Sequence, residues 1–380
     1  MYKKNDSRVF VFGAGVSKAV AGAPVMSELF SKMKERYEQE KSLPDGLERN
    51  MRIREFKRIQ EFIEKLERKA KKRFGQIGEH EYPKIKRGIR ENIEYIITLL
   101  DIHTEYGARF EFEQPGVDWS PYPFIPFEDI GKNEIDQVRS CLNTYLYLCL
   151  CDLDDKNAIF KKFVEGVKLN PNDHLISFNY DVLMEQALLE EKKWSSVGGY
   201  VGVKQLKSGY NESALKSATG CSAYKILKLH GSITWVQEGP RPIDINNPPV
   251  ITLHKWDSSP FFPSLGRILN RRPQGARPTW ILPSYVKTFS ENSFLIKIWR
   301  EAQRILAETK CLVVLGYSFP EVDSQSQLLL ASLPDDCSIL IVDPDADAIK
   351  MRMDKLFQFP DISVQNMGFE KWVQQGYPGL

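Results

Sequence analysis

A short glycine-rich turn near the start of the chain could bind a phosphate. The apolar run at residues 8–12 leads directly into the segment GAGVS (13–17), and a helical pattern follows. Gly13 permits a tight turn, and Gly15 removes a side chain where a phosphate would approach the backbone. Free amides at a helix start attract anions, and Ser17 could cap the helix or donate to the phosphate. A plain strand-to-helix turn is the alternative interpretation.

Polar residues follow two other predicted strands. Residues 174–178 lead into Asn179 and Asp181, and residues 225–229 lead into His230. Open α/β sheets bind ligands at the carboxyl ends of their strands. An amide can place a water molecule, and an imidazole with a pKa near 7 can take its proton. A lone histidine at a strand end is more often a structural polar residue, but in the company of Asn179 and Asp181 it favours a catalytic site.

Two later strand ends add weaker candidates. Gly316 and Ser318 follow the run CLVVL and could face a phosphate or a ribose. Asp343 closes the run SILIVD, where its carboxylate could accept a hydrogen bond from a ribose hydroxyl. The alternatives are a simple loop at Gly316 and an Asp-Pro turn at Asp343. Lys18 stands where a dehydrogenase fingerprint has its third glycine, which argues against that class of enzyme.

Buried parallel strands would have to position these residues. Dense apolar runs bounded by glycine or polar residues recur along the chain, with helical patterns between several of them. This alternation predicts an α/β fold, a Rossmann-like parallel sheet with helices on both faces. The expected strands are 8–12, 174–178, 225–229, 311–316 and 338–343, with weaker candidates at 250–253 and 279–282, and the expected helices are 27–38, 181–191, 293–308 and 344–357.

Residues 31–170 contain no convincing strand. Their apolar residues recur at helical spacing, which predicts an all-helical insertion after the first strand-helix unit. The predicted organisation is a Rossmann-like domain of residues 1–30 and 171–380 and a helical insertion domain of residues 31–170. Residues 48–90 are rich in lysine and arginine and could bind nucleic acid or an acidic partner. A solvated helix face is the favoured interpretation, because aromatic residues are not interleaved with the charges.

Composition narrows the class of protein. The 380 residues carry 52 basic and 50 acidic side chains, and a net charge of +2 does not indicate a globally basic nucleic-acid binder. The six cysteines show no CxxC spacing, so we expect neither a metal site nor a disulfide framework. No signal-peptide pattern or membrane span of ~20 apolar residues is found. We therefore expect a cytoplasmic protein with reduced thiols and no membrane partner.

Taken in order, these motifs resemble those of the sirtuin family. The segments are GAGVS with Gly22-Ala23-Pro24 downstream, SFNYD, LHGS and GYS, and they are most similar to the sirtuin-like domains of bacterial anti-phage defence proteins. The resemblance covers residues 8–30 and about 172–345. It implies a Rossmann-type domain that binds NAD as its substrate and cleaves the nicotinamide–ribose bond.

The resemblance also implies a role for each matching residue. Asn179 would lie by the nicotinamide ribose and orient the attacking group, and Asp181 would bind the nicotinamide carboxamide. His230 would be the general base, and Asp343 would contact the adenosine ribose. The remaining residues that it implies in binding the phosphates and riboses of NAD are Gly13, Ala14, Gly15, Ser17, Pro24, Gly316 and Ser318.

The chain departs from the protein-deacylating sirtuins in two places. Those enzymes have a four-cysteine zinc module after the histidine motif, whereas residues 231–315 contain only Cys311. In the loop that follows Gly22-Ala23-Pro24, the protein-deacylating sirtuins usually have an arginine and a phenylalanine. Here the segment is Val25-Met26-Ser27, and those two residues are missing. Both losses argue against an acyl-lysine peptide as acceptor, so water becomes the expected acceptor. We predict an NAD glycohydrolase that depletes NAD as an effector of anti-phage defence, with no metal.

Two alternative functions stay open from the sequence. One is NAD-dependent protein deacylation or ADP-ribosyl transfer, and the other is a non-catalytic module that senses NAD or ADP-ribose. The resemblance further implies a homo-oligomer that works with a partner such as a HerA-type ATPase, a nuclease or an argonaute-like protein.

Overall fold

The structure is a computed structural model of the 380-residue chain. It describes residues 7–74, 93–110, 132–151, 153, 158–194, 199–201, 224–237, 250–251, 277–282, 293–320, 323–357, 359 and 361–380. The chain divides into two compact units. The first comprises Met1–Ala23, Leu150–Trp280 and Phe289–Leu380, and the second comprises Pro24–Cys149 and Ile281–Thr288.

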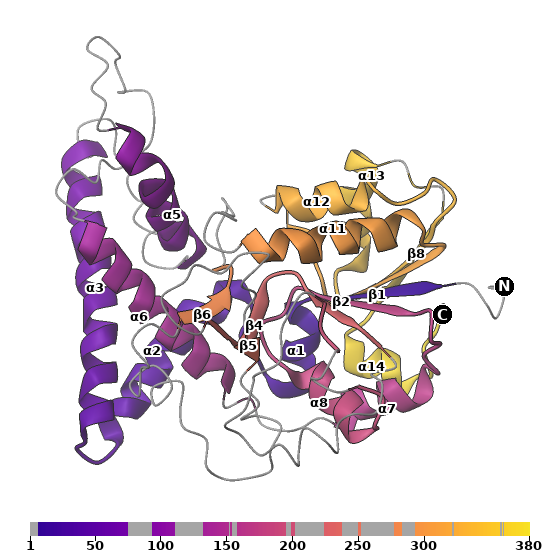
Figure 1. Ribbon diagram of the computed structural model, residues 1–380, viewed down its shortest axis with the longest axis horizontal. Helices are drawn as coiled ribbons and strands as arrows, with labels where there is room; N and C mark the ends of the chain where they lie inside the picture. Colours follow the sequence, from indigo (N-terminus) through magenta and orange to yellow (C-terminus); the bar gives the residue numbers. More distant parts are fainter. Residues whose placement is uncertain are drawn as a thin grey trace. The chain divides into compact units, whose positions relative to one another are not determined.

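A six-stranded parallel sheet forms the core of the first unit (Figure 1). Its strands are β1 (Arg8–Phe12), β2 (His174–Ser177), β3 (Ile226–Lys228), β7 (Cys311–Leu315), β8 (Ser338–Asp343) and β9 (Ile362–Asn366). The spatial order is β3-β2-β1-β7-β8-β9. Strands follow one another outward from β1 in one direction and from β7 in the other. The point where the order switches, between β1 and β7, is where such sheets bind ligands.

Helices cover both faces of this sheet, as Figure 1 shows. One layer contains α1 (Ala14–Ala21), α7 (Ala158–Gly166), α8 (Leu183–Glu190) and α14 (Phe369–Gln374), and the other contains α11 (Ser293–Ala307), α12 (Ser324–Leu330) and α13 (Ala346–Leu356). The central strand β1 is apolar on both faces because both are covered, and its Phe10 and Phe12 each lie 5.7 Å from Phe163 of α7, ring centroid to ring centroid. The predicted Rossmann-like α/β fold is confirmed.

A second, smaller sheet corrects part of the sequence analysis. Strands β4 (Gly231–Gln237), β5 (Val250–Ile251) and β6 (Arg277–Trp280) form an antiparallel sheet in the order β5-β4-β6. The weak candidates at 250–253 and 279–282 therefore contribute to this sheet and not to the parallel one. Strand β4 was not expected. It follows His230 at once because Gly231, with φ of +85°, lets the chain turn sharply out of the parallel sheet.

The second unit is helical in the residues that the structure describes. Its helices are α2 (Met26–Ser42), α3 (Leu47–Phe74), α5 (Ile93–Phe110) and most of α6 (Lys132–Cys151). Helix α3 buries one stripe that includes Phe56, Ile59 and Leu66, which is the pattern of an amphipathic helix. The rest of the basic stretch, residues 75–90, lies outside the described residues. The predicted boundaries at residues 30 and 171 stay a prediction.

None of the described helices combines the length and the apolar character needed to cross a bilayer.

Candidate functional site at the switch point of the sheet

Two glycine turns touch where the strand order switches. The turn after β1 contains Gly13 and Gly15, and the turn after β7 contains Gly316. The Gly15 amide donates to the Gly316 carbonyl oxygen at 2.9 Å. A Cβ added to Gly13 would lie only 2.4 Å from that same oxygen. The absence of side chains therefore lets the two turns pack backbone to backbone.

We expect Gly316→Ala to destabilise the first unit by about 3 kcal/mol. Gly316 has φ of +58°, and its Cβ would lie 2.5 Å from the Val16 backbone nitrogen, so strain and overlap add. Gly22→Ala is the matched control, because Gly22 has φ of +67° with nothing within 4 Å of its Cβ. Urea denaturation should show a loss of only about 1 kcal/mol in the control. Equal losses of stability in the two variants would show that close packing of the two turns does not contribute to stability.

The start of helix α1 is suited to an anion. Ala14 is exposed at its first position, and the amide of Ala14 has no hydrogen-bond acceptor among the described residues, unlike those of Gly13, Gly15 and Val16. The first turn carries no acidic residue. A helix N-terminus of this kind can bind a phosphate group, because its free amides donate hydrogen bonds and its dipole favours negative charge.

Asn179 joins the end of β2 to the first glycine turn. Its side-chain amide nitrogen Nδ2 donates to the Gly13 carbonyl oxygen and to the Ser17 hydroxyl, each at 2.9 Å. A carbonyl oxygen can only accept, so the atom that faces Gly13 must be the nitrogen. The side-chain oxygen Oδ1 then points elsewhere and has no partner among the described residues. It is the acceptor that could orient a hydroxyl or a water molecule.

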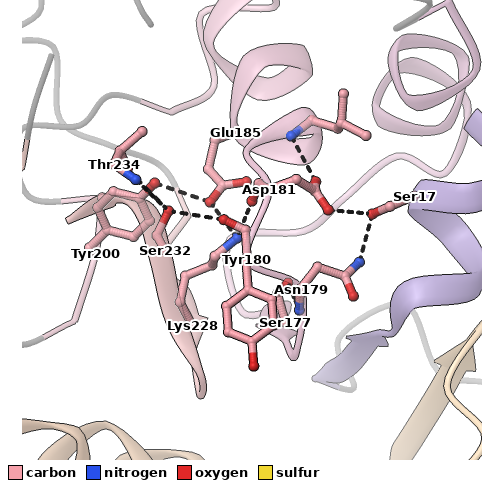
Figure 2. Close-up of polar contacts among 12 residues, drawn as sticks. Ser17, Ser177, Asn179, Tyr180, Asp181, Glu185, Tyr200, Lys228, Ser232 and Thr234 are labelled. Carbon is pink, nitrogen blue, oxygen red and sulfur yellow. Dashed lines mark hydrogen bonds and ion pairs between the residues drawn. The ribbon is translucent and has the colours of Figure 1, made fainter. Parts of the chain in front are cut away.

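Ser17 and Asp181 complete a buried chain of hydrogen bonds, drawn in Figure 2. The Ser17 hydroxyl donates to Asp181 Oδ2 at 2.6 Å, and the Leu183 amide donates to Asp181 Oδ1 at 3.2 Å. Ser17 is 2% exposed and Asp181 is 5% exposed. In this structure both side chains are engaged within the protein, where they hold Asn179 in one orientation. The ligand contacts predicted for them remain predictions.

His230 lies at the same edge of the sheet as Asn179. It follows β3, the parallel neighbour of β2, and the Leu229 amide before it donates to the Ser177 carbonyl oxygen at 3.0 Å. The half-buried imidazole ring lies 5.2 Å from the ring of Phe178 and 6.0 Å from that of Tyr180, between centroids. These two residues flank Asn179 in the chain. The structure thus brings the predicted amide and imidazole to one edge of the sheet.

Aromatic rings that the sequence did not single out line this edge. The Trp299 ring lies 6.2 Å from that of His230, and its Nε1 donates to the Leu229 carbonyl oxygen at 2.8 Å. Tyr317 stacks on Phe178 at 4.1 Å with the ring planes 4° apart. The stack connects the end of β7 to the end of β2 across the switch point. Trp299 lies in an amphipathic helical pattern, and nothing in that pattern predicts that its ring lies near His230.

The weaker candidates lie further along the same edge. Ser318 is exposed, and its carbonyl oxygen accepts from Arg352 at 2.8 Å. Asp343 ends β8, next to β7, and its Oδ1 accepts from the Asp345 amide at 2.9 Å, as an aspartate in a turn does. Burial raises the pKa of the Asp343 carboxyl, and the Asp345 amide opposes this effect. Pro24 belongs to the other unit.

A buried ion pair beneath the site was also missed by the sequence analysis. Lys228 of β3 lies 3.1 Å from Glu185 Oε1 of α8, and each side chain is 1% exposed. The Tyr200 hydroxyl donates to the same oxygen at 3.0 Å. Burial raises the pKa of the Glu185 carboxyl, and the ammonium of Lys228 lowers it. A lysine within the apolar run KILKL was the available signal.

Among the residues that the structure describes, no group of three or more histidine, cysteine, aspartate or glutamate side chains is placed to hold a metal ion.

No family model and no curated protein matches the chain. Solved structures do match. Sir2 in complex with an inhibitor, 2′-O-acetyl-ADP-ribose and a deacetylated peptide is 12% identical, with a TM-score of 0.35 over 97% of this chain and 91% of that chain. A mutant Sir2 homologue with 2′-O-acetyl-ADP-ribose is 14% identical, with a TM-score of 0.36 over 75% and 95%. Another mutant, with ADP-ribose, is 16% identical, with a TM-score of 0.36 over 73% and 86%.

Proposed function

We propose that the chain is an NAD glycohydrolase that splits NAD and water into nicotinamide and ADP-ribose. The observation that carries this proposal is the meeting of three parts at one edge of the parallel sheet. These parts are the pair of glycine turns at the switch point, the amide of Asn179 with its side-chain oxygen unpartnered among the described residues, and the imidazole of His230. The first part suits a dinucleotide, and the other two suit the activation of water.

The reaction needs little acid catalysis. The bond between nicotinamide and ribose breaks through an oxocarbenium-like state, and the electron pair of the bond leaves with nicotinamide, which becomes neutral. Water forms the new bond to the anomeric carbon and loses one proton to a base. Asn179 Oδ1 would orient the ribose or the water, and His230 would accept the proton. A fixed ribose and a well-placed base are therefore the main requirements.

Ser17 and Asp181 support the proposal as positioning residues. The amide cannot rotate without breaking the two hydrogen bonds from Asn179 Nδ2, and a buried carboxylate holds the Ser17 hydroxyl that accepts one of them. An oriented acceptor costs no reorganisation at the moment of reaction. The same chain of hydrogen bonds explains why a serine and an aspartate are buried here.

The test is incubation of the purified chain with NAD, followed by chromatography and mass detection. We expect equal amounts of nicotinamide and ADP-ribose from the wild type and neither from His230→Ala. His174→Ala is the matched control, because His174 begins β2 at the opposite edge of the sheet. NAD that is bound but not cleaved would favour the sensing module instead. Nicotinamide release that requires an acyl-lysine peptide would favour deacylation.

The biological setting follows from the motif resemblance. We propose an NAD-depleting effector of anti-phage defence that acts as a homo-oligomer with a partner protein. Cellular NAD measured during phage infection should fall when the wild type is expressed and stay constant with His230→Ala.

A further inference from the structure

Two opposite charges are buried beside the turn that contains Asn179 and Asp181 (Figure 2). Lys228 and Glu185 are each 1% exposed and lie 3.1 Å apart, and the buried Tyr200 donates to the same carboxylate oxygen. Lysine and glutamate are almost never buried so completely without a partner. The attraction within such a pair roughly offsets the cost of removing both charges from water, so the pair is a poor explanation of stability. Its position suggests another purpose.

The ammonium of Lys228 has a second partner, the backbone carbonyl oxygen of Asp181. Asp181 belongs to the turn that begins with Asn179 and ends at the start of helix α8, where Glu185 occupies the first turn. Lys228 stands two positions before His230. One side chain therefore connects the segment that carries the imidazole to the segment that carries the amide.

Neighbouring contacts between the same two segments involve backbone groups. The Ile233 amide donates to the Tyr180 carbonyl oxygen at 2.9 Å, and the Leu229 amide donates to the Ser177 carbonyl oxygen at 3.0 Å. The carbonyl of Asp181 lies between these contacts and α8, and it is held by a charged side chain. A hydrogen bond from a charged donor is stronger than one between neutral groups. The hydrogen bond from the Lys228 ammonium should thus hold the turn more strongly than either of these two backbone contacts does.

We propose that Lys228 and Glu185 are positioning residues, which together fix the turn of Asn179 relative to His230. The inference rests on the proposed NAD hydrolysis and adds residues that act through Asn179 without touching the substrate. Tyr200 holds the carboxylate of Glu185, the carboxylate holds the ammonium of Lys228, and the ammonium holds the turn.

The double variant Lys228→Met/Glu185→Leu separates positioning from stability. Replacing both charges with apolar side chains of similar size leaves no charge unpaired, so the fold should survive. The carbonyl of Asp181 loses its charged donor, however. We expect a urea midpoint near that of the wild type, and a kcat for nicotinamide release about 100-fold lower with KM changed less than about threefold. Wild-type kcat in the folded double variant would overturn the proposal.

Arg8→Met is the control for stability alone. Arg8 pairs with Asp173 at 2.6 Å at the amino ends of β1 and β2, the edge opposite the site. This variant should have a lower urea midpoint and the wild-type kcat per folded molecule. A loss of kcat in Arg8→Met that matches the loss in the double variant would show that turnover merely follows stability, which would overturn the positioning role.

Amide hydrogen exchange at residues 178–184 distinguishes failure of this inference from failure of the proposed function. If the wild type does not cleave NAD, the proposed function is wrong, but the tie on the turn can still be measured. Faster exchange of these amides in the double variant than in the wild type supports the tie. Unchanged exchange contradicts it, whether or not NAD is cleaved.

Discussion

Asn179→Ala is expected to lower the rate of nicotinamide release from NAD about 10³-fold. The substitution removes Oδ1, the acceptor that we assign to the ribose or the water. It also removes both hydrogen bonds from Nδ2, to the Gly13 carbonyl and the Ser17 hydroxyl. The substrate would lose its orientation while the base at His230 remained. Steady-state kinetics at saturating NAD measure this effect, with urea denaturation as the check on folding.

Two further variants separate the roles of the amide. Asn179→Asp keeps an oxygen in place of Oδ1 but sets a second oxygen against the Gly13 carbonyl, so it should also lose activity. Ser17→Ala keeps the whole amide and removes only its support, and we expect a loss of about tenfold. Asn170→Ala is the control, because Asn170 precedes β2 at the opposite edge of the sheet. Full activity in Asn179→Ala would remove this residue from the mechanism.

Lys228→Met alone is expected to lower the free energy of unfolding by about 4 kcal/mol. The single substitution leaves Glu185 buried without its counter-charge, while the Tyr200 hydroxyl still donates to it. This outcome contrasts with the small change expected for the double variant. The difference between the two variants measures the cost of one unpaired charge.

The decrease in the free energy of unfolding caused by Lys228→Met should depend on pH. Burial already raises the pKa of Glu185 above its ordinary 4.5, and removal of the ammonium raises it further. A carboxyl whose pKa is raised in the folded state favours folding below pH 4.5, and this contribution disappears as pH rises through the folded pKa. Urea denaturation should therefore show that Lys228→Met lowers the free energy of unfolding less at pH 5 than at pH 8. Equal losses would contradict the account.

An exposed ion pair gives the control for this second prediction. Lys310 and Asp336 lie 2.6 Å apart with 52% and 68% of their side chains exposed. Since water screens such a pair, Lys310→Met should leave the urea midpoint close to that of the wild type at both pH values.

The central strands could be predicted because both faces of the sheet are covered. Strands β1, β7 and β8 are continuous apolar runs, which is the pattern that burial on two faces demands. Strand β9 was not predicted because it is an edge strand, and each of residues 362–366 is half-buried or exposed, so the strand is not a dense apolar run. Strand β4 was not predicted because its first two residues, Gly231 and Ser232, are residue types that are common in loops.

The candidate residues Asn179 and His230 lie after the carboxyl ends of β2 and β3, as the sequence analysis predicted. What it could not supply was the pairing among them. Ser17 and Asp181 are 164 positions apart, and their hydrogen bond exists only because β1 and β2 are neighbours in the sheet. The second role of Gly15, contact with the turn of Gly316, likewise depends on β7 lying beside β1. Local patterns can indicate an edge of a sheet, but not which polar groups satisfy one another there.

The position of β1 in the sheet also bears on biosynthesis. Its two neighbours are residues 174–177 and 311–315, so one side of this strand stays unpaired until residue 177 has been translated and the other until residue 315. Such long-range pairing folds late and leaves a nascent chain prone to aggregation. The contact between the two glycine turns, which needs Gly316, forms only after β7 has been translated. A ribosome-bound chain that has not yet reached Gly316 would therefore lack this contact, and the NAD hydrolysis that we propose would be absent from such nascent chains.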